Sequence, residues 1–272
     1  MAGASGFIGS ALMDQMSRSA PEPLPSDLLR SADPESLRLY LQDVEGYCLV
    51  FAIGRGSSSG AKGMAPSERT ILFDKIWAAR SQLLRADKVI WFGSSAEYGS
   101  AEVPAMESTP PAPVTSYGLS KTLETRAWLM MRELGVNVTV VRPTTVYGSG
   151  QAGTMLIPAV VSALRTGVSL KVECPDAVRD YIHVSDLAKA TELLLAMDAD
   201  LPAILNLGSG FCYSTRSVIS CFEQALGRPL QIERFSNRTS GCHDVRVNSH
   251  LVSDLTGWRP VCDLESTVGS FL

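Results

Sequence analysis

The 272-residue sequence has no long apolar run and only three histidines. Charge or proline interrupts every apolar stretch before the ~18 residues that a membrane span needs, so no transmembrane helix is expected. The net charge is −4, which indicates no basic surface for nucleic acid. Glycine and serine stand where a signal peptide has its apolar core, and this predicts a cytoplasmic protein.

The six cysteines lack the paired spacing of a metal site, and they lie at positions 48, 174, 212, 221, 242 and 262. Reduced thiols, several of them filling the core, are therefore expected, with no bound metal. An apolar fraction of 45% beside 19% charged residues is typical of a globular protein with a sizeable core.

Short apolar runs alternate with helical patterns along the chain. Runs that predict buried strands cover 47–53, 88–92 and 136–141, with a brief strand-like piece at 26–29. Patterns that predict helices cover 7–19, 67–84 and 122–134, and a further helix start at 33–36 leads into 37–41. The segment 54–63 is rich in glycine and serine and predicts a loop. The alternation predicts an α/β fold with a parallel doubly wound sheet.

The first ten residues contain three glycines at spacings of three, Gly3, Gly6 and Gly9, followed at once by a helical pattern. Glycine allows a tight turn and lets phosphates approach backbone amides closely. The helix that follows directs free N–H groups and its positive dipole end at the same phosphates. This predicts a dinucleotide pyrophosphate loop in a Rossmann-like fold, with a plain glycine-rich turn as the alternative.

Only Met1 and Ala2 precede this loop, where a buried parallel strand is expected. We therefore expect the first strand to be missing or truncated, with the true start of the protein about six or more residues upstream. If Met1 is genuine, we expect a weakened cofactor site or a strand supplied from elsewhere.

Tyr117 and Lys121 lie four residues apart at the start of a predicted helix, on one face. A lysine ammonium close to a phenol favours the phenolate. Such a tyrosine can exchange a proton with a carbonyl or hydroxyl oxygen while a hydride moves at the carbon. For the pair alone, a solvated helix face is the alternative.

Further motifs follow one another along the chain, namely FGSSAEYG (92–99), RPTTVYGSGQ (142–151), RDYIHVSD (179–186), NLGSG (206–210) and TGWRP (256–260). Together with the glycine loop and the Tyr–Lys pair, they closely resemble the extended short-chain dehydrogenase/reductase superfamily of NAD-dependent epimerase/dehydratase type. The resemblance implies a Rossmann-like NAD(P)-binding domain over 1–148. It also implies a small α/β substrate lobe over 149–272, with chain interchange near 175–210 and a helix at 158–164 roofing the substrate.

The resemblance implies a catalytic triad of Ser94, Tyr117 and Lys121. Ser94 would hydrogen-bond the reacting oxygen, with the adjacent Ser95 as the alternative. Tyr117 would act as the acid/base, and Lys121 would hold the nicotinamide ribose. The cofactor would be NAD or NADP, which the sequence does not distinguish.

Cofactor-binding residues are implied as well. The pyrophosphate would lie on Gly3, Gly6, Phe7, Ile8 and Gly9. Asp27 and Leu28 would meet the adenine, and Ala52 would line the cofactor. A turn-capping aspartate and a strand-packing alanine are the alternatives for Asp27 and Ala52.

Substrate contacts are implied for Ser94, Ser95, Arg179 and Arg238. The two arginines would bind the diphosphate, because guanidinium groups donate in a planar fork and stay charged. Surface salt bridges are the alternative for both. His183 is expected to be structural, and Asp180 and Asp186 are expected to fix loops.

The family's dehydratases carry acids two or three positions before the Tyr-Gly pair, where this chain has Ala96 and Ser95, and the acid is displaced to Glu97. The segment SSAEYG (94–99) most resembles that of nucleotide-sugar 4-ketoreductases such as GDP-4-keto-6-deoxymannose reductase. We therefore expect reduction of a 4-keto-6-deoxyhexose at C4. The alternatives are a nucleotide-sugar 4-epimerase and a non-catalytic dinucleotide-binding protein. The resemblance also implies a homodimer, formed through the helices after Ser67 and Tyr117 as is common in relatives.

Overall fold

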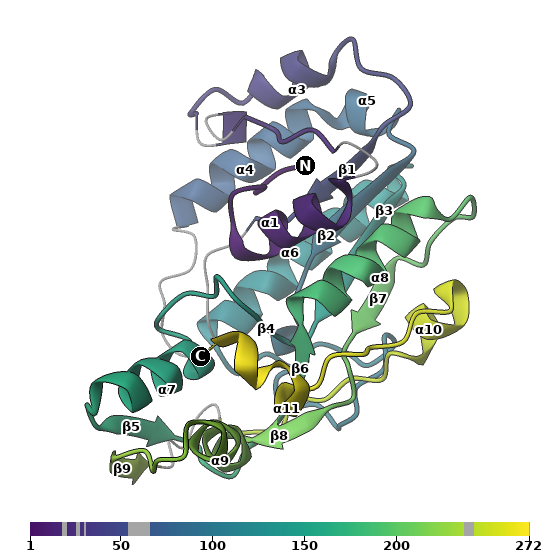
Figure 1. Ribbon diagram of the computed structural model, residues 1–272. Coiled ribbons are helices and arrows are strands. Elements are labelled where there is room, and N and C mark those ends of the chain that lie inside the picture. The colour runs from purple at the N-terminus through teal and green to yellow at the C-terminus, as the bar shows by residue number, and fades with distance from the viewer. Residues whose placement is uncertain (18–20, 26–27, 30, 54–65, 237–241, 272) are drawn as a thin grey trace.

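A four-stranded parallel sheet forms the centre of the N-terminal half (Figure 1). The computed structural model describes residues 1–17, 21–25, 28–29, 31–53, 66–236 and 242–271. The sheet has the order β1-β2-β3-β7, made of β1 (Cys48–Phe51), β2 (Lys88–Phe92), β3 (Val138–Pro143) and β7 (Ile204–Leu207). All three pairings are parallel. The prediction of an α/β fold with a parallel doubly wound sheet is confirmed.

Helices cover both faces of this sheet because alternate strand residues point to opposite faces. Leu49, Val89 and Val138 lie in one core cluster. That cluster also holds residues of α3 (Ser36–Leu41), α4 (Pro66–Ala78), α5 (Arg80–Leu83) and α6 (Ser116–Glu133). Val50 and Ile90 lie in a second cluster. It includes residues of α1 (Phe7–Gln15), α8 (Val184–Ala196) and α10 (His250–Thr256).

Two small sheets lie at the end of the molecule away from α3 and α5 (Figure 1). One has the order β4-β6-β8, from β4 (Thr145–Tyr147), β6 (Val178–His183) and β8 (Cys212–Ser214). The other pairs β5 (Leu170–Glu173) with β9 (Ile232–Ser236). They pack with α7 (Leu156–Thr166), α9 (Thr215–Leu226), α11 (Leu264–Thr267) and the 3-10 helix η3 (Val268–Phe271) around a third core cluster. β7 belongs to the large sheet, although β6 and β8 flank it in sequence. The division of the chain into two domains at residue 148 stays a prediction.

The sheet extends beyond β1 by a single bridged residue, Ala2. Ala2 bridges Phe51 in parallel, with its N–H donating to Val50 O at 2.8 Å and its carbonyl accepting from Ala52 N at 2.9 Å. On the opposite side, Met1 O accepts from Leu24 N at 2.7 Å. Ala2 therefore continues the sheet beyond β1, directly ahead of the glycine loop.

Some predicted elements were wrong or displaced. Residues 28–29 are helical rather than strand-like, since the Leu28 N–H closes a turn on Pro25 O at 3.1 Å. The helix expected over 67–84 divides at Ala79 into α4 and α5. Helix α6 begins at Ser116, six residues before the expected start, because the Thr115 side chain caps it. The expected loop at 54–63 lies outside the described residues.

The expectation that every cysteine is reduced is wrong for one pair. Cys174 and Cys242 form a disulfide with their Cα atoms 5.1 Å apart. These residues meet because the segment after Cys242 runs along β6, where Val245 bridges Arg179. Cys48 and Cys212 are exposed rather than core-filling. Within the described ranges, no helix has the length and apolar character of a membrane span.

Lys75 on α4 forms hydrogen bonds with the segment 28–36, which precedes β1. Its side chain is fully buried. Its ammonium lies 2.7–2.8 Å from four oxygens, Leu28 O, Ser31 Oγ, Asp33 O and Ser36 Oγ. A buried ammonium is tolerated only when its N–H groups are hydrogen-bonded, and here the acceptors all come from one short segment. Lys75 thereby orders the segment that carries Leu28.

We expect Lys75→Met to lower the free energy of unfolding by about 2–4 kcal/mol, because a buried cluster of carbonyl and hydroxyl oxygens loses the hydrogen bonds that the ammonium donates. Equilibrium urea unfolding followed by circular dichroism measures this. Lys189→Met is the control, since Lys189 makes an exposed ion pair with Glu192. Its effect should stay below about 1 kcal/mol. Equal effects of the two variants would contradict a special role for Lys75.

Candidate active site

The predicted site residues gather where parallel strands end. The carboxyl ends of parallel strands meet at one edge of a sheet, where α/β proteins bind ligands. Ala52 follows β1, and Gly93 and Ser94 follow β2. The glycine loop follows Ala2, which lies beside β1. Three predicted features from separate parts of the sequence therefore share one edge.

The glycine loop packs too tightly for a side chain at Gly3 or Gly9. Gly3 has φ +80°, and a Cβ atom there would lie 2.4 Å from the Ala52 carbonyl oxygen. A Cβ atom on Gly9 would lie 1.9 Å from Gly3 O. Gly6 is the N-cap of α1, no side chain caps the first N–H groups, and the first turn has no acidic residue. The first amides of α1 are thus available to an anion, as a pyrophosphate requires.

The other predicted cofactor residues lie around this loop or outside the described residues. Ile8 is half-buried against the core under α1. Phe7 approaches Gly150, in the loop after β4. Leu28 packs against the same core cluster as Ile53, the residue after Ala52. Asp27 lies outside the described residues.

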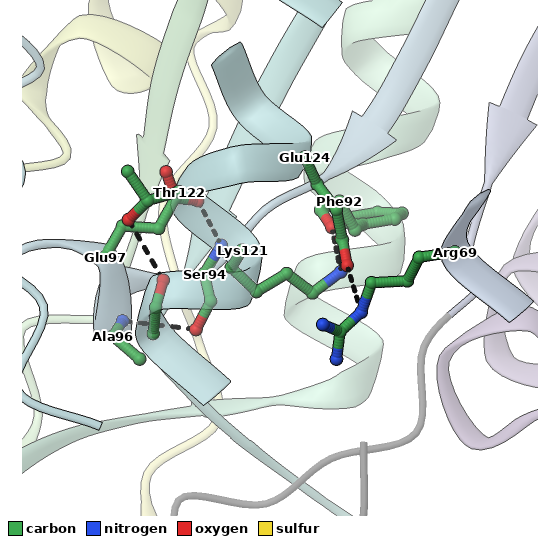
Figure 2. A network of polar contacts seen from close by, with 9 residues as sticks. Arg69, Phe92, Ser94, Ala96, Glu97, Lys121, Thr122 and Glu124 are labelled. Carbon is green, nitrogen blue, oxygen red and sulfur yellow. Dashed lines mark hydrogen bonds and ion pairs between the residues drawn. The ribbon is translucent and has the colours of Figure 1, made fainter. Parts of the chain in front are cut away.

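Ser94 opens a tight turn, the 3-10 helix η2 (Ser95–Glu97) (Figure 2). The Ser94 Oγ accepts from Ala96 N at 3.1 Å, and Glu97 Oε1 accepts from Ser94 N at 2.9 Å. This reciprocal pair is a capping box. Ser94 and Ser95 are both largely buried. The Ser94 hydroxyl uses a lone pair in this bond, so its proton is left for another acceptor.

A buried ion pair supports the turn from below. Arg142 on β3 reaches Glu97 Oε2 with Nε at 3.0 Å and Nη2 at 2.8 Å. The guanidinium lies 4.7 Å from the centre of the Tyr98 ring. The Tyr98 hydroxyl donates to Asn206 Oδ1 on β7 at 2.7 Å. Burial raises the pKa of Glu97, and Arg142 opposes that rise. Glu97 is fully buried and bonded at both oxygens, so it faces no substrate.

Tyr117 and Lys121 lie on the first two turns of α6, against the Ser94 turn. A Cβ atom on Gly118 would lie 2.4 Å from Ala96 O, so only glycine fits after Tyr117. Tyr117 is half-buried. Lys121 is buried, and its Nζ donates to Phe92 O at 3.0 Å and to Glu124 Oε2 at 2.7 Å (Figure 2). Within the part of the chain that the structure describes, these two bonds direct the ammonium to the end of β2 and to Glu124 rather than to the Tyr117 hydroxyl.

Arg179 lies on β6, half-buried, and pairs with Tyr213 of β8. Burial lowers the pKa of His243, and the nearby Arg179 charge lowers it further. Arg179 therefore lies beside the segment that follows the disulfide. Arg238, the second predicted diphosphate ligand, lies outside the described residues.

The residues expected to be structural have structural contacts. Asp180 is buried and accepts from Ser209 N at 3.0 Å and Gly210 N at 3.1 Å. Asp186 Oδ2 accepts from Val261 N at 3.1 Å and Cys262 N at 2.9 Å. The expectation that both aspartates fix loops is confirmed. His183 caps α8 by accepting from Ser185 N.

Two residues that support the site were not identified from the sequence. Glu124 stands three residues after Lys121, and the helical i, i+3 spacing could have indicated their pairing. Arg142 is 45 residues from Glu97, and no sequence pattern joins them. Their contact depends on β2 and β3 being neighbours.

We expect Glu97→Gln to lower the free energy of unfolding by about 3–5 kcal/mol, because Arg142 is left as a buried, uncompensated charge. Urea unfolding measures this, with Glu133→Gln as a control at an exposed position of α6. The double variant Glu97→Gln/Arg142→Met should recover part of the loss because the buried charge is gone. A double variant less stable than Glu97→Gln alone would contradict this account.

The pattern of the NAD dependent epimerase/dehydratase family matches residues 1–208. The chain is 27% identical over 293 residues to a dTDP-6-deoxy-L-talose 4-dehydrogenase (NAD(P)(+)) from Kitasatospora kifunensis, covering 98% of this chain and 92% of the relative. It is 31% identical over 193 residues to a UDP-glucose 4-epimerase from Corynebacterium glutamicum, covering 64% and 58%. The fold is similar to that of UDP-glucuronic acid 4-epimerase from Bacillus cereus in complex with UDP-glucuronic acid and NAD. That likeness has a TM-score of 0.84 and 20% identity, and covers 99% of this chain and 96% of the other.

Proposed function

Because the chain belongs to the NAD dependent epimerase/dehydratase family, we propose that it reduces a nucleotide-linked 4-keto-6-deoxyhexose at C4 with NADH or NADPH. One observation carries the proposal. The Ser94 turn packs against the first turn of α6, so that Ser94, Tyr117 and Lys121 come to the sheet edge that also bears the glycine loop. The near full-length similarity to a sugar-nucleotide 4-dehydrogenase supports the reaction type.

The cofactor site is built from the glycine loop. Gly3 and Gly9 let the loop pack closely against Ala52 and against itself, and Gly6 precedes the uncapped start of α1, where backbone N–H groups would bind a pyrophosphate. Phe7 and Ile8 would bind the pyrophosphate as well, and Asp27 and Leu28 would meet the adenine. Ala52 would line the cofactor, and Lys121 would hold the nicotinamide ribose. When bound, the reduced nicotinamide supplies a hydride.

Ser94 and Tyr117 would handle the carbonyl oxygen of the sugar. The Ser94 hydroxyl donates to that oxygen, since its own bond to Ala96 N uses only a lone pair. As hydride adds to C4, the electron pair of the C–O double bond moves onto the oxygen. Tyr117 transfers its hydroxyl proton there and recovers a proton from solvent. Arg179 and Arg238 would hold the diphosphate, under a lobe over 149–272 that includes α7.

The contacts of Glu97 favour reduction over dehydration. Loss of water from a sugar needs an acid and a base that reach the substrate. In this chain the acid nearest to those positions is Glu97, which is bonded to Arg142 and to Ser94 N beneath the turn. Glu97 is therefore not placed to act on a substrate.

The second candidate is a nucleotide-sugar 4-epimerase, favoured by the identity to a UDP-glucose 4-epimerase. The same three catalytic residues would serve both reactions. An epimerase returns the hydride to its substrate and keeps its cofactor, whereas a reductase releases it in each cycle. Purified protein that carries NAD and interconverts C4 epimers without added cofactor would favour the epimerase.

We expect Tyr117→Phe to lower kcat at least about 100-fold, because the alkoxide loses its proton donor. The assay follows oxidation of NADH or NADPH at 340 nm with GDP-, dTDP-, UDP- and CDP-linked 4-keto-6-deoxyhexoses. Tyr40→Phe, on the exposed side of α3, is the control. Unchanged turnover by Tyr117→Phe would overturn the proposed mechanism. Cofactor binding by the wild type with neither reduction of these sugars nor interconversion of C4 epimers of nucleotide sugars would instead indicate a non-catalytic dinucleotide-binding protein.

Helix α6 also bears a row of exposed apolar residues. Leu119, Leu123 and Met130 are each more than half exposed, and their spacing sets them on one side of the helix. Trp77 on α4 is exposed as well. Exposed apolar groups of this kind mark interaction surfaces. We propose that α4 and α6 form a homodimer interface.

We expect the protein to be a dimer by multi-angle light scattering and Leu123→Glu to shift it to a monomer, because a buried unpaired carboxylate opposes association. Val261→Glu is the control, since Val261 is exposed on a different segment. A monomeric wild type, or a Leu123→Glu variant that stays dimeric, would contradict this interface.

A further inference from the structure

The Lys121 ammonium is held by two acceptors inside the protein. One is the Phe92 carbonyl at 3.0 Å, at the end of β2, and the other is Glu124 Oε2 at 2.7 Å. The Trp91 ring lies 5.3 Å from Nζ. An ammonium has three N–H donors, so the contacts within the described part of the chain leave one for a ligand.

Glu124 is a buried carboxylate between two cations. Its Oε1 lies 3.7 Å from Arg69 Nε on α4, and its Oε2 bonds Lys121 one turn earlier on α6 (Figure 2). Glu124 is 4% exposed, so it faces no substrate. A buried charge is costly unless it is paired, and both oxygens of this one lie against a cation. Of its two cationic neighbours, Lys121 is the one at the predicted site, and its contact with Glu124 is the shorter.

We propose that Glu124 is a positioning residue that acts through Lys121. It holds the ammonium at the end of β2 before the cofactor arrives, so that the remaining N–H is already directed toward the nicotinamide ribose. This inference rests on the proposed function, because it takes Lys121 as the ribose ligand. The Lys121 side chain has four rotatable bonds, and ordering it in advance removes that entropy loss from the binding step.

A double-mutant cycle on coenzyme affinity separates positioning from mere stabilisation. The variants are Glu124→Gln, Lys121→Met and the double variant, with Glu133→Gln as the matched control on the same helix. The Kd for NADH and NADPH is measured by quenching of tryptophan fluorescence, since Trp91 lies near Lys121. Urea unfolding of each variant confirms that the folded protein is titrated.

We expect Glu124→Gln to raise the coenzyme Kd about tenfold, the size of a lost charge-assisted hydrogen bond. Lys121→Met should raise it at least as much. In the Lys121→Met background, Glu124→Gln should change it by less than about twofold, because its effect passes through the lysine. With saturating coenzyme, kcat of Glu124→Gln should stay within about threefold of the wild type while the coenzyme KM rises.

A Glu124→Gln variant that binds coenzyme as the wild type does would overturn the inference. The inference would also be overturned if Glu124→Gln raised the coenzyme Kd by the same factor in the wild type and in the Lys121→Met background. If Glu124→Gln does not fold, Glu124→Asp keeps the charge, shortens its reach by one methylene and enters the same cycle. Wild-type protein that binds coenzyme but turns over no nucleotide sugar would contradict only the proposed function, since the cycle reads binding alone. Wild-type protein that binds neither coenzyme would contradict both.

Discussion

Buried charges held in fixed pairs at the carboxyl edge of the central sheet are the interactions on which the rest of this structure depends. Glu97 with Arg142 and Lys121 with Glu124 lie almost wholly out of solvent. A buried ion survives only with a partner in close geometry, so each pair restricts the two elements that carry it. The first pair joins the Ser94 turn to β3, and the second holds the Lys121 ammonium within hydrogen-bond reach of the end of β2.

These pairs also restrict the chemistry. An acid that stabilises a turn from within is not available to a substrate, and Glu97 is such an acid. The groups at the edge include two hydroxyls, that of Ser94, which uses only a lone pair in its bond to Ala96 N, and that of the half-buried Tyr117. Hydroxyls suit the protonation of an alkoxide, which both reduction and epimerisation at a sugar carbon require.

The N-terminal side of the sheet is held by few but specific contacts. Ala2 lies beside β1 and exchanges backbone hydrogen bonds with Val50 and Ala52. Lys75 holds the segment from Leu28 to Ser36 against α4 through contacts with four oxygens. Both sets of contacts satisfy backbone groups that would otherwise lack hydrogen-bond partners.

The sequence by itself determined the α/β class, the glycine loop and the Tyr117–Lys121 pair, because these depend on local spacing. Apolar runs identified β1, β2 and β3, and the spacing of Gly3, Gly6 and Gly9 identified the turn before α1. The tertiary structure alone decided the partners. Arg142 meets Glu97 only because β2 and β3 pair in register, and Cys174 meets Cys242 only because a distant segment runs along β6. Residues far apart in sequence become neighbours through strand order and packing, which no local pattern records.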